Sequence, residues 1–95
     1  MTDSIRIDKW LWFARFCKSR SLAKALVEDG AVRLNGLVVG KASTPVKIGD
    51  RVEFALRGHP FAVEVTAPGE RRGPAAEAAL LYRDLSPGAV DRGCR

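Results

Sequence analysis

The sequence predicts an α+β protein in which two N-terminal helices pack on a small, curved, mostly antiparallel sheet, followed by a C-terminal helix. Apolar residues recur at helical spacing between residues 9 and 29, whereas apolar and polar residues alternate in short runs between residues 31 and 66. The chain has 95 residues, 46% of them hydrophobic, which suffices for one compact core. We therefore expect one domain over residues 1–85 and a short flexible tail over residues 86–95.

The first helix is expected over about residues 9–17, because Asp8 is a good N-cap. The apolar residues of this helix occupy two sides. One side carries Trp10, Phe13, Ala14 and Cys17. Trp12 lies on another side, flanked by Lys9 and Arg15. Trp12 is therefore either a core residue, as large aromatic residues usually are, or a partly exposed ring on which a base or ribose stacks.

The second helix is expected over about residues 20–29, with Ser19 as its N-cap and Gly30 as its C-terminal stop. Its apolar stripe consists of Leu22, Ala23, Leu26 and Val27. Arg20 and Lys24 stand one turn apart on the other side, where two like charges cost about 0.2–0.5 kcal/mol unless a phosphate lies between them.

The start of this second helix gives the sharpest local indication of a phosphate site. Ser19, Arg20 and Ser21 combine hydroxyl groups, a cation and free backbone N–H groups where the helix dipole attracts anions. The alternative is an ordinary N-cap beside two solvated cations, one of which, Lys24, is partly relieved by pairing with Glu28.

A hairpin follows, because Asn35-Gly36 separates two β-prone runs at 31–34 and 37–39. A type I′ turn needs two residues with positive φ, and this dipeptide supplies them. Arg33 alternates with apolar neighbours, so its side chain should point away from the core.

Further elements complete the expected scaffold: a loop at 41–47, strands at 51–57 and 61–66, and a helix at 74–85. Pro74 suits the first position of that helix. His59, the one histidine of the sequence, falls in the turn between the two strands and should face solvent. Residues 1–4 should form a loose end.

Positive charge is concentrated on the two N-terminal helices. The net charge is +5, and residues 6–24 carry six cations against one anion. Residues 58–95 carry five arginines against five acids, so this part of the chain is balanced. A concentrated basic face attracts polyanions and releases counterions when it binds them. The alternative is a solubilising surface, which is the commoner outcome for a charge run taken alone.

The composition gives little support to catalysis, metal binding or membrane insertion. Cys17 and Cys94 are far apart and lack zinc-site spacing, so we expect a reduced, cytoplasmic protein with neither metal nor cofactor. No apolar run suits a signal peptide or a transmembrane span. The single histidine and the lack of a phosphate-binding loop or a G-x-S-x-G motif favour a binding module over an enzyme.

Three N-terminal segments resemble the S4-type RNA-binding domain: residues 6–11 (RIDKWL), 19–23 (SRSLA) and 29–36 (DGAVRLNG). Within that group, the sequence is most similar to the ribosome-associated heat shock protein 15 family. The marks of this branch are residues 8–12 (DKWLW) and residues 71–82 (RRGPAAEAALLY). The similarity covers about residues 5–85.

This resemblance implies an αL-type S4 fold that binds RNA with its helical face and the nearby hairpin. It also implies a non-catalytic role, in which the protein binds rRNA on the free large ribosomal subunit that carries nascent chain-tRNA and aids recycling under heat stress. Together with the argument for Trp12, the expected RNA-binding residues are Arg6, Lys9, Trp12, Arg15, Lys18, Ser19, Arg20, Ser21, Lys24, Arg33, Asn35 and Lys41. The family often continues into a long basic C-terminal extension, whereas this sequence stops at Arg95, so affinity is expected to rest on the helical face.

Other functions stay open on the sequence. One is a ribosome quality-control factor that supports nascent-chain tailing, and another is the accessory RNA-binding module of an RNA-modifying enzyme. DNA binding is a further alternative, because charge does not distinguish the two polymers. The expected partner is structured RNA, meaning rRNA and also tRNA as a candidate, and we expect a monomer that does not bind membranes.

Overall fold

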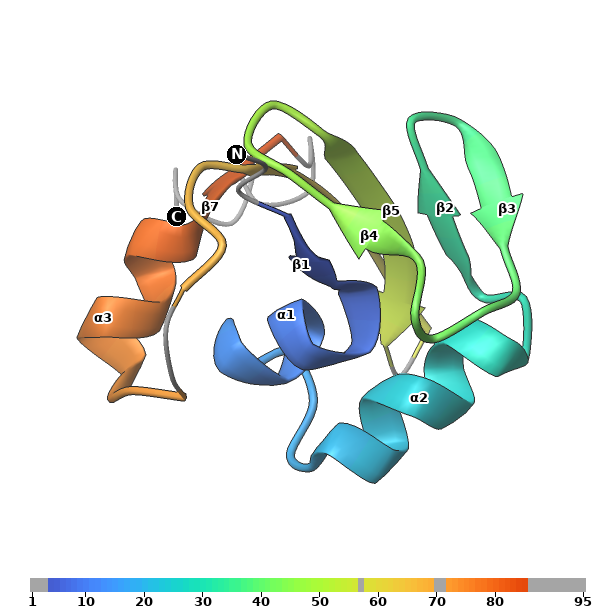
Figure 1. The fold of residues 1–95 in the computed structure, drawn as a ribbon, viewed down its shortest axis with the longest axis horizontal. Coiled ribbons are helices and arrows are strands. Elements are labelled where there is room, and N and C mark those ends of the chain that lie inside the picture. Colours follow the sequence, from blue (N-terminus) through green and yellow to red (C-terminus); the bar gives the residue numbers. More distant parts are fainter. Residues whose placement is uncertain (1–3, 57, 70–71, 86–95) are drawn as a thin grey trace.

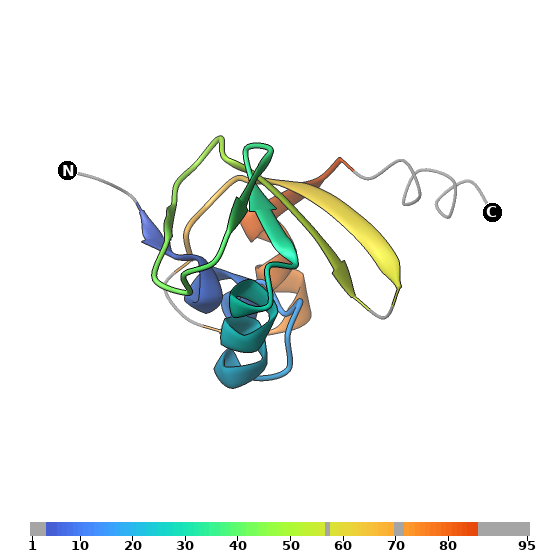
Figure 2. The same ribbon diagram turned by 90° about the vertical axis from the view of Figure 1, so that its right-hand side faces the viewer.

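In a computed structural model of the chain, the described residues are 4–56, 58–69 and 72–85. Helices α1 (Ile7–Phe13) and α2 (Arg20–Glu28) lie on one side of a curved antiparallel sheet (Figures 1 and 2). The strands of this sheet, in spatial order, are β3 (Leu37–Val39), β2 (Val32–Leu34), β5 (Arg51–Leu56), β6 (His59–Val65) and β7 (Tyr82–Asp84). The expected α+β class and the mostly antiparallel sheet are confirmed, while the expected tail at 86–95 lies outside the described residues.

Helix α1 starts earlier and ends sooner than the expected range of 9–17. Its first turn rests on a neighbouring loop, because the N–H groups of Ile7 and Asp8 donate to carbonyl oxygens in residues 42–44 at 2.8 and 3.3 Å. Arg6, not Asp8, occupies the N-cap position. The helix ends before Arg15, which adopts a left-handed backbone conformation with φ 66°. Tertiary contacts, and not the local capping signal, therefore set the start of α1.

Helix α2 agrees with the sequence-based expectation. The Ser19 side-chain oxygen accepts the N–H of Leu22 at 3.2 Å and caps the helix, and Gly30 with φ 77° follows its end. Ala23 and Val27 are fully buried in the core shared with α1 and the sheet. The Leu22 side chain, expected in the apolar stripe, is instead 54% exposed.

The tight hairpin between β2 and β3 is confirmed. Asn35 and Gly36 have φ values of 54° and 88°, as a type I′ turn requires. The Asn35 amide also fastens this turn to the next one. Its Nδ2 donates to Asp50 Oδ1 at 3.2 Å, and its Oδ1 accepts the Arg51 N–H at 2.9 Å. The expected strands at 51–57 and 61–66 correspond to β5 and β6.

His59 opens strand β6 and so does not lie in the turn before it. Its backbone is paired with Leu56 at the end of the β5–β6 ladder, and the residue is exposed, as expected. Antiparallel pairing simply continues further toward the turn than the alternation of side chains indicates.

A second, two-stranded sheet is an addition to the expected fold. Strand β1 (Ile5–Arg6) pairs antiparallel with β4 (Pro45–Val46), with Ile5 opposite Val46. The sequence predicted a loop where β4 lies and no strand at residues 5–6, because strands of two residues leave no readable alternation. This pairing brings the loop at 41–44 onto the first turn of α1.

The C-terminal helix is shorter than predicted. Helix α3 (Ala75–Ala78) passes into a 3-10 turn, η1 (Ala79–Leu81), and the chain then forms strand β7. The expectation of helix at residues 82–85 is therefore wrong. Tyr82 is in register with Val65 of β6, and its ring lies 4.6 Å from that of Phe16. Pairing with the sheet edge and aromatic packing outweigh the helix propensity of this segment.

The core lies between the helices and the sheet. Trp10 is fully buried, and its Nε1 donates to the Ala67 carbonyl oxygen at 3.1 Å. An aromatic cluster formed by Phe16, Phe54, Phe61 and Tyr82 closes one end of this core. Cys17 is buried nearby, and its burial raises the pKa of the thiol, whereas Cys94 lies outside the described residues. None of the helices in the described part of the chain has the length and apolar character needed to span a bilayer.

Candidate nucleic-acid interface

Asp8 holds together the first part of the candidate site. Its side chain is 2% exposed, and both carboxylate oxygens accept Arg6, from Nε at 3.2 Å and from Nη2 at 3.3 Å. On the other side, Arg20 Nε lies 3.5 Å from Asp8 Oδ2. The side chains of Arg6 and Arg20 are 48% and 44% exposed, so both guanidinium groups also reach solvent. One carboxylate thus orients two arginines from β1 and α2 and leaves the trio with net positive charge.

The start of α2 continues this array. Arg20, Ser21 and Lys24 are exposed, and Arg20 and Lys24 are one helical turn apart, as the sequence predicted. Ser19 is half-buried because its hydroxyl caps the helix. The expected pairing of Lys24 with Glu28 is not seen in the described part of the chain. Among the described residues Lys24 therefore has no acidic partner, while Arg20 is paired with Asp8 but still 44% exposed, so both cations can contact an anionic ligand.

Lys41 borders the same place, and Lys9 is next to Asp8 in the chain. Lys41 opens the turn at 41–44, whose carbonyl oxygens accept the first N–H groups of α1, so this exposed lysine lies beside the start of that helix. Lys9 follows Asp8 directly, and its ammonium group lies 5.5 Å from the centroid of the Phe13 ring. We use the term basic surface for Arg6, Lys9, Ser19, Arg20, Ser21, Lys24 and Lys41.

The connection between α1 and α2 carries two more of the expected residues. Arg15 is exposed, and its Nε donates to the carbonyl oxygen of Gly73 at 2.7 Å, which uses one of the five N–H groups of a guanidinium. Lys18 is exposed just before the cap of α2. This connection extends the basic surface toward the segment that precedes α3.

Trp12 falls between the two alternatives that the sequence left open. It is half-buried and packs against the core, and it lies beside Phe13 with 5.7 Å between ring centroids. The Arg72 guanidinium lies 5.8 Å from the Trp12 ring centroid, where a cation interacts favourably with the ring. Arg72 Nε is buried and has no acceptor among the described residues. An arginine of the chain itself therefore covers Trp12 at the place where a base was expected.

Arg33 and Asn35 are not brought together with the basic surface. Arg33 pairs in register with Glu53 and Val38, while its neighbour Val32 is fully buried toward the helices. Arg33 thus projects from the sheet face opposite the helices. The amide of Asn35 is used on both sides by the turn contacts described above, so its role in the structure is to hold the hairpin.

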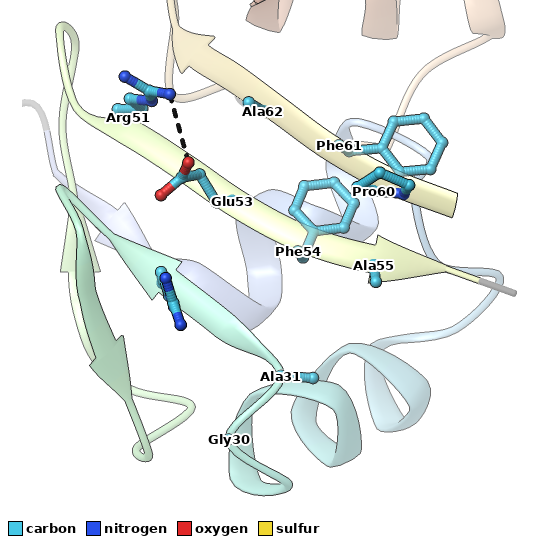
Figure 3. A pocket seen from close by; sticks show the side chains of 10 residues that line it. Gly30, Ala31, Arg51, Glu53, Phe54, Ala55, Pro60, Phe61 and Ala62 are labelled. Carbon is cyan, nitrogen blue, oxygen red and sulfur yellow. Dashed lines mark hydrogen bonds and ion pairs between the residues drawn. The ribbon is translucent and has the colours of Figure 1, made fainter. Parts of the chain in front are cut away.

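Arg33 borders a shallow groove of about 640 Å³ that runs between the end of α2 and strands β5 and β6. Figure 3 shows Arg51 and Glu53 joined along β5. Arg51 Nη2 donates to Glu53 Oε2 at 3.3 Å. The rings of Phe54 and Phe61 stack 5.4 Å apart beside it. Glu53 lies opposite Arg33 on the neighbouring strand, so positive charge does not accumulate in this groove.

Comparison with known proteins decides the family. The S4 domain matches residues 5–52 of the chain. The chain belongs to the S4 domain family. The match spans β1, both N-terminal helices and the hairpin, and so contains every part of the basic surface.

Relatives within the S4 domain family lie close to the branch that the sequence indicated. The trimeric structure of Vibrio cholerae Heat Shock Protein 15 aligns with a TM-score of 0.85 and 36% identity, over 96% of this chain and 91% of that one. Heat shock protein 15 of Escherichia coli K12 is 40% identical over 88 residues, which are 93% of this chain and 65% of that protein. The RQC P-site tRNA stabilizing factor of Streptococcus pneumoniae is 34% identical over 61 residues, 64% of this chain and 68% of that protein. The S4-type fold and the similarity to heat shock protein 15 are confirmed, and the chain spans about 65% of the length of the Escherichia coli relative.

Two features of the site were not predicted from the sequence. The first is the role of Asp8, which sequence reasoning took for a helix cap and which instead pairs two arginines. The single acid in a run of six cations was the signal available for it. The second is the approach of Arg72 and Gly73 to α1, which depends on contacts between residues almost sixty positions apart and leaves no local trace.

Proposed function

We propose that this protein binds structured RNA through the basic surface and makes its contacts mainly with phosphates. The observation that carries this proposal is the shared pairing of Arg6 and Arg20 with the buried Asp8. Two guanidinium groups fixed by one carboxylate lose less side-chain entropy when they bind a phosphate. Beside them, the start of α2 offers free N–H groups and the positive end of the helix dipole.

Phosphate contacts fix position and carry little sequence information, so specificity should come from RNA shape and from 2′-OH groups. Electrophoretic or anisotropy titrations with an RNA hairpin test this directly. If about five phosphates are neutralised, the logarithm of the binding constant falls with the logarithm of salt concentration with a slope of about −3.5 to −4.5. DNA is a weaker candidate, and a matched DNA hairpin that competes equally with the RNA would contradict the RNA assignment.

The biological target of the proposal is the free large ribosomal subunit that carries nascent chain-tRNA, which the protein binds to aid recycling of dissociated subunits under heat stress. Similarity to heat shock protein 15 over 93% of the chain supports this choice. In this role the protein is cytoplasmic, works without a cofactor and performs no catalysis. rRNA is its primary ligand, and tRNA is a second contact.

Sedimentation of the tagged chain on a sucrose gradient tests the target. The expected result is co-migration with the free large subunit, lost in the double variant Arg20→Ala/Lys24→Ala. Arg83→Ala serves as the matched control, because Arg83 is 69% exposed, pairs with Glu64 and lies on β7, away from the basic surface. Migration of the wild-type chain at the top of the gradient would reject the ribosomal assignment.

A second candidate function is ribosome quality control, favoured by the similarity to the RQC P-site tRNA stabilizing factor. In that role the protein would support addition of residues to nascent chains on obstructed large subunits. Purification of its native complexes distinguishes the two roles: co-purification of a tailing enzyme supports quality control, and its absence supports recycling. An activity of the purified chain on RNA would instead favour an RNA-modifying enzyme.

A further inference from the structure

A second groove of about 850 Å³ lies next to the basic surface, between the α1–α2 connection, one side of α2 and the tip of the β5–β6 hairpin. Its apolar lining includes Leu22, Leu26 and Phe61. Leu22 is 54% exposed, although it lies in the first turn of a well-capped helix and although it belongs to the apolar stripe predicted for burial. The groove therefore offers an apolar floor that the fold of the described residues leaves uncovered.

Cations surround this floor. Arg15, Lys18 and Arg72 line the groove together with His59, whereas Asp29 is the one acid among the described residues that line it. The Arg15 side chain is oriented by its hydrogen bond to the Gly73 carbonyl oxygen, and its backbone is in the left-handed conformation. Lys18 directly precedes Ser19, so the groove begins where the basic surface ends. An apolar floor under a cationic rim is complementary to a flat base attached to a phosphate.

We infer that this groove binds one unpaired nucleotide of the RNA whose helical part lies on the basic surface. The base rests on Leu22, Leu26 and Phe61, and the flanking phosphate contacts Arg15 and Lys18. The volume falls within the range of roughly 300–1,000 Å³ that is typical of small-ligand sites, and it accommodates a nucleotide. This inference rests on the proposed function and adds to it a preference for RNA with an unpaired base next to a stem.

An apolar peptide is the competing occupant, and the charges disfavour it. A peptide without acidic groups would cover Arg15, Lys18 and Arg72 while offering them no compensating negative charge, and desolvating an unpaired cation is costly. A nucleotide covers the same apolar area and brings its own phosphate. The charge balance of the rim therefore selects the nucleotide.

Two RNA hairpins with the same stem test the inference, one blunt and one with a short unpaired 3′ overhang. Wild-type protein should bind the overhang RNA about five- to tenfold more tightly than the blunt RNA, in line with the usual gain from seating one base. Leu22→Gln should remove this preference and leave affinity for the blunt RNA unchanged. Leu37→Gln is the matched control, because Leu37 is 74% exposed and lies on the β2–β3 hairpin outside the groove.

A measurement on the wild-type chain keeps the test independent of any variant. A 4-thiouridine in the overhang should crosslink on irradiation to residues of the groove, which mass spectrometry of the digested protein can locate. Equal affinity for the two RNAs, or crosslinks confined to the β2–β3 hairpin, would overturn the inference. Binding of an uncharged apolar peptide that depends on Leu22, without any preference for the overhang RNA, would also overturn it. Binding of the blunt hairpin tests the proposed function, and the preference for the overhang tests the groove. Failure of the groove inference can therefore be told apart from failure of the proposed function.

Discussion

Arg20 Nε lies 3.5 Å from Oδ2 of Asp8, and this contact links the start of α2 to the first turn of α1. Asp8 also accepts Arg6 at both oxygens and the N–H of Lys9 at 2.7 Å, so four nitrogen atoms from three residues converge on one buried carboxylate. The pairing of the two helices and the positions of the two guanidinium groups therefore depend on the same residue. We therefore expect stability and RNA binding to be linked at this point of the fold.

Asp8→Asn distinguishes the effect of net charge on RNA binding from the effect of orienting Arg6 and Arg20. The variant adds one unit of positive charge, which by simple Coulomb attraction would strengthen binding to RNA. We expect the opposite, a several-fold loss of RNA affinity, because Arg6 and Arg20 lose the group that orients them. The free energy of unfolding in urea should fall by about 1–2 kcal/mol, since bonds to a charged acceptor are weakened. Glu28→Gln is the matched control: it adds the same charge at an exposed position of α2 and should leave stability unchanged and affinity unchanged or slightly increased.

Arg20→Ala and Lys24→Ala remove cations from the start of α2. Each should weaken binding to all RNA hairpins alike and reduce the magnitude of the salt slope by about one, as expected for the loss of one phosphate contact. Arg83→Ala should leave both quantities unchanged. An unchanged affinity in the double variant Arg20→Ala/Lys24→Ala would reject the start of α2 as an anion site.

Gly36→Ala tests the hairpin turn through the backbone alone. Gly36 has φ 88°, and a Cβ added there would meet nothing within 4 Å, so the cost is purely conformational. We expect the free energy of unfolding to fall by about 1–2 kcal/mol, the usual cost of a left-handed conformation for a residue with a Cβ. Gly40→Ala has the same open surroundings without a positive φ, and it should leave stability unchanged or slightly raised. Equal losses for the two variants would contradict the I′ assignment.

Cys17 provides a prediction that depends on pH. Burial raises the pKa of its thiol above the ordinary value of 9.0. In a Cys94→Ser background, native protein should therefore react with iodoacetamide much more slowly than protein unfolded in urea, because less thiolate is present and access is restricted. Since the folded-state pKa is the higher one, this group favours the folded state only while the thiol stays protonated in both states. Its contribution is present below pH 9.0 and declines as the pH rises above that value. Above pH 9.0 the free energy of unfolding should therefore fall in Cys94→Ser, and it should fall less in Cys17→Ala/Cys94→Ser. Equal alkylation rates of native and unfolded protein would contradict this account.

Signals that act over a few residues allowed part of this fold to be predicted. The cap by Ser19, the stop at Gly30 and the Asn35-Gly36 turn each depend on neighbouring backbone atoms, and all three are found as expected. Strands β5 and β6 were equally accessible, because their alternation runs over six and seven residues. Local chemistry thus fixes α2, the hairpin and the central strands.

Contacts between distant residues determine the parts of the fold that the sequence did not predict. The start of α1 follows from carbonyl oxygens in the loop at 42–44, and β7 follows from pairing with β6. The same holds for the candidate site. The cations at the start of α2 were identified from spacing along one helix, whereas the link between Asp8 and Arg20 spans two helices and the position of Arg33 follows from strand register. Sequence patterns therefore indicated the residue types of the candidate site, and the tertiary structure determines which of them lie close together.

The salt dependence of RNA binding tests the central claim most directly. That claim is that a fixed array of cations at the start of the two helices contacts RNA phosphates. Titration of the wild-type chain with one RNA hairpin at several salt concentrations should give a slope of about −3.5 to −4.5 on logarithmic axes. A slope close to zero would show that the basic surface is not the contact.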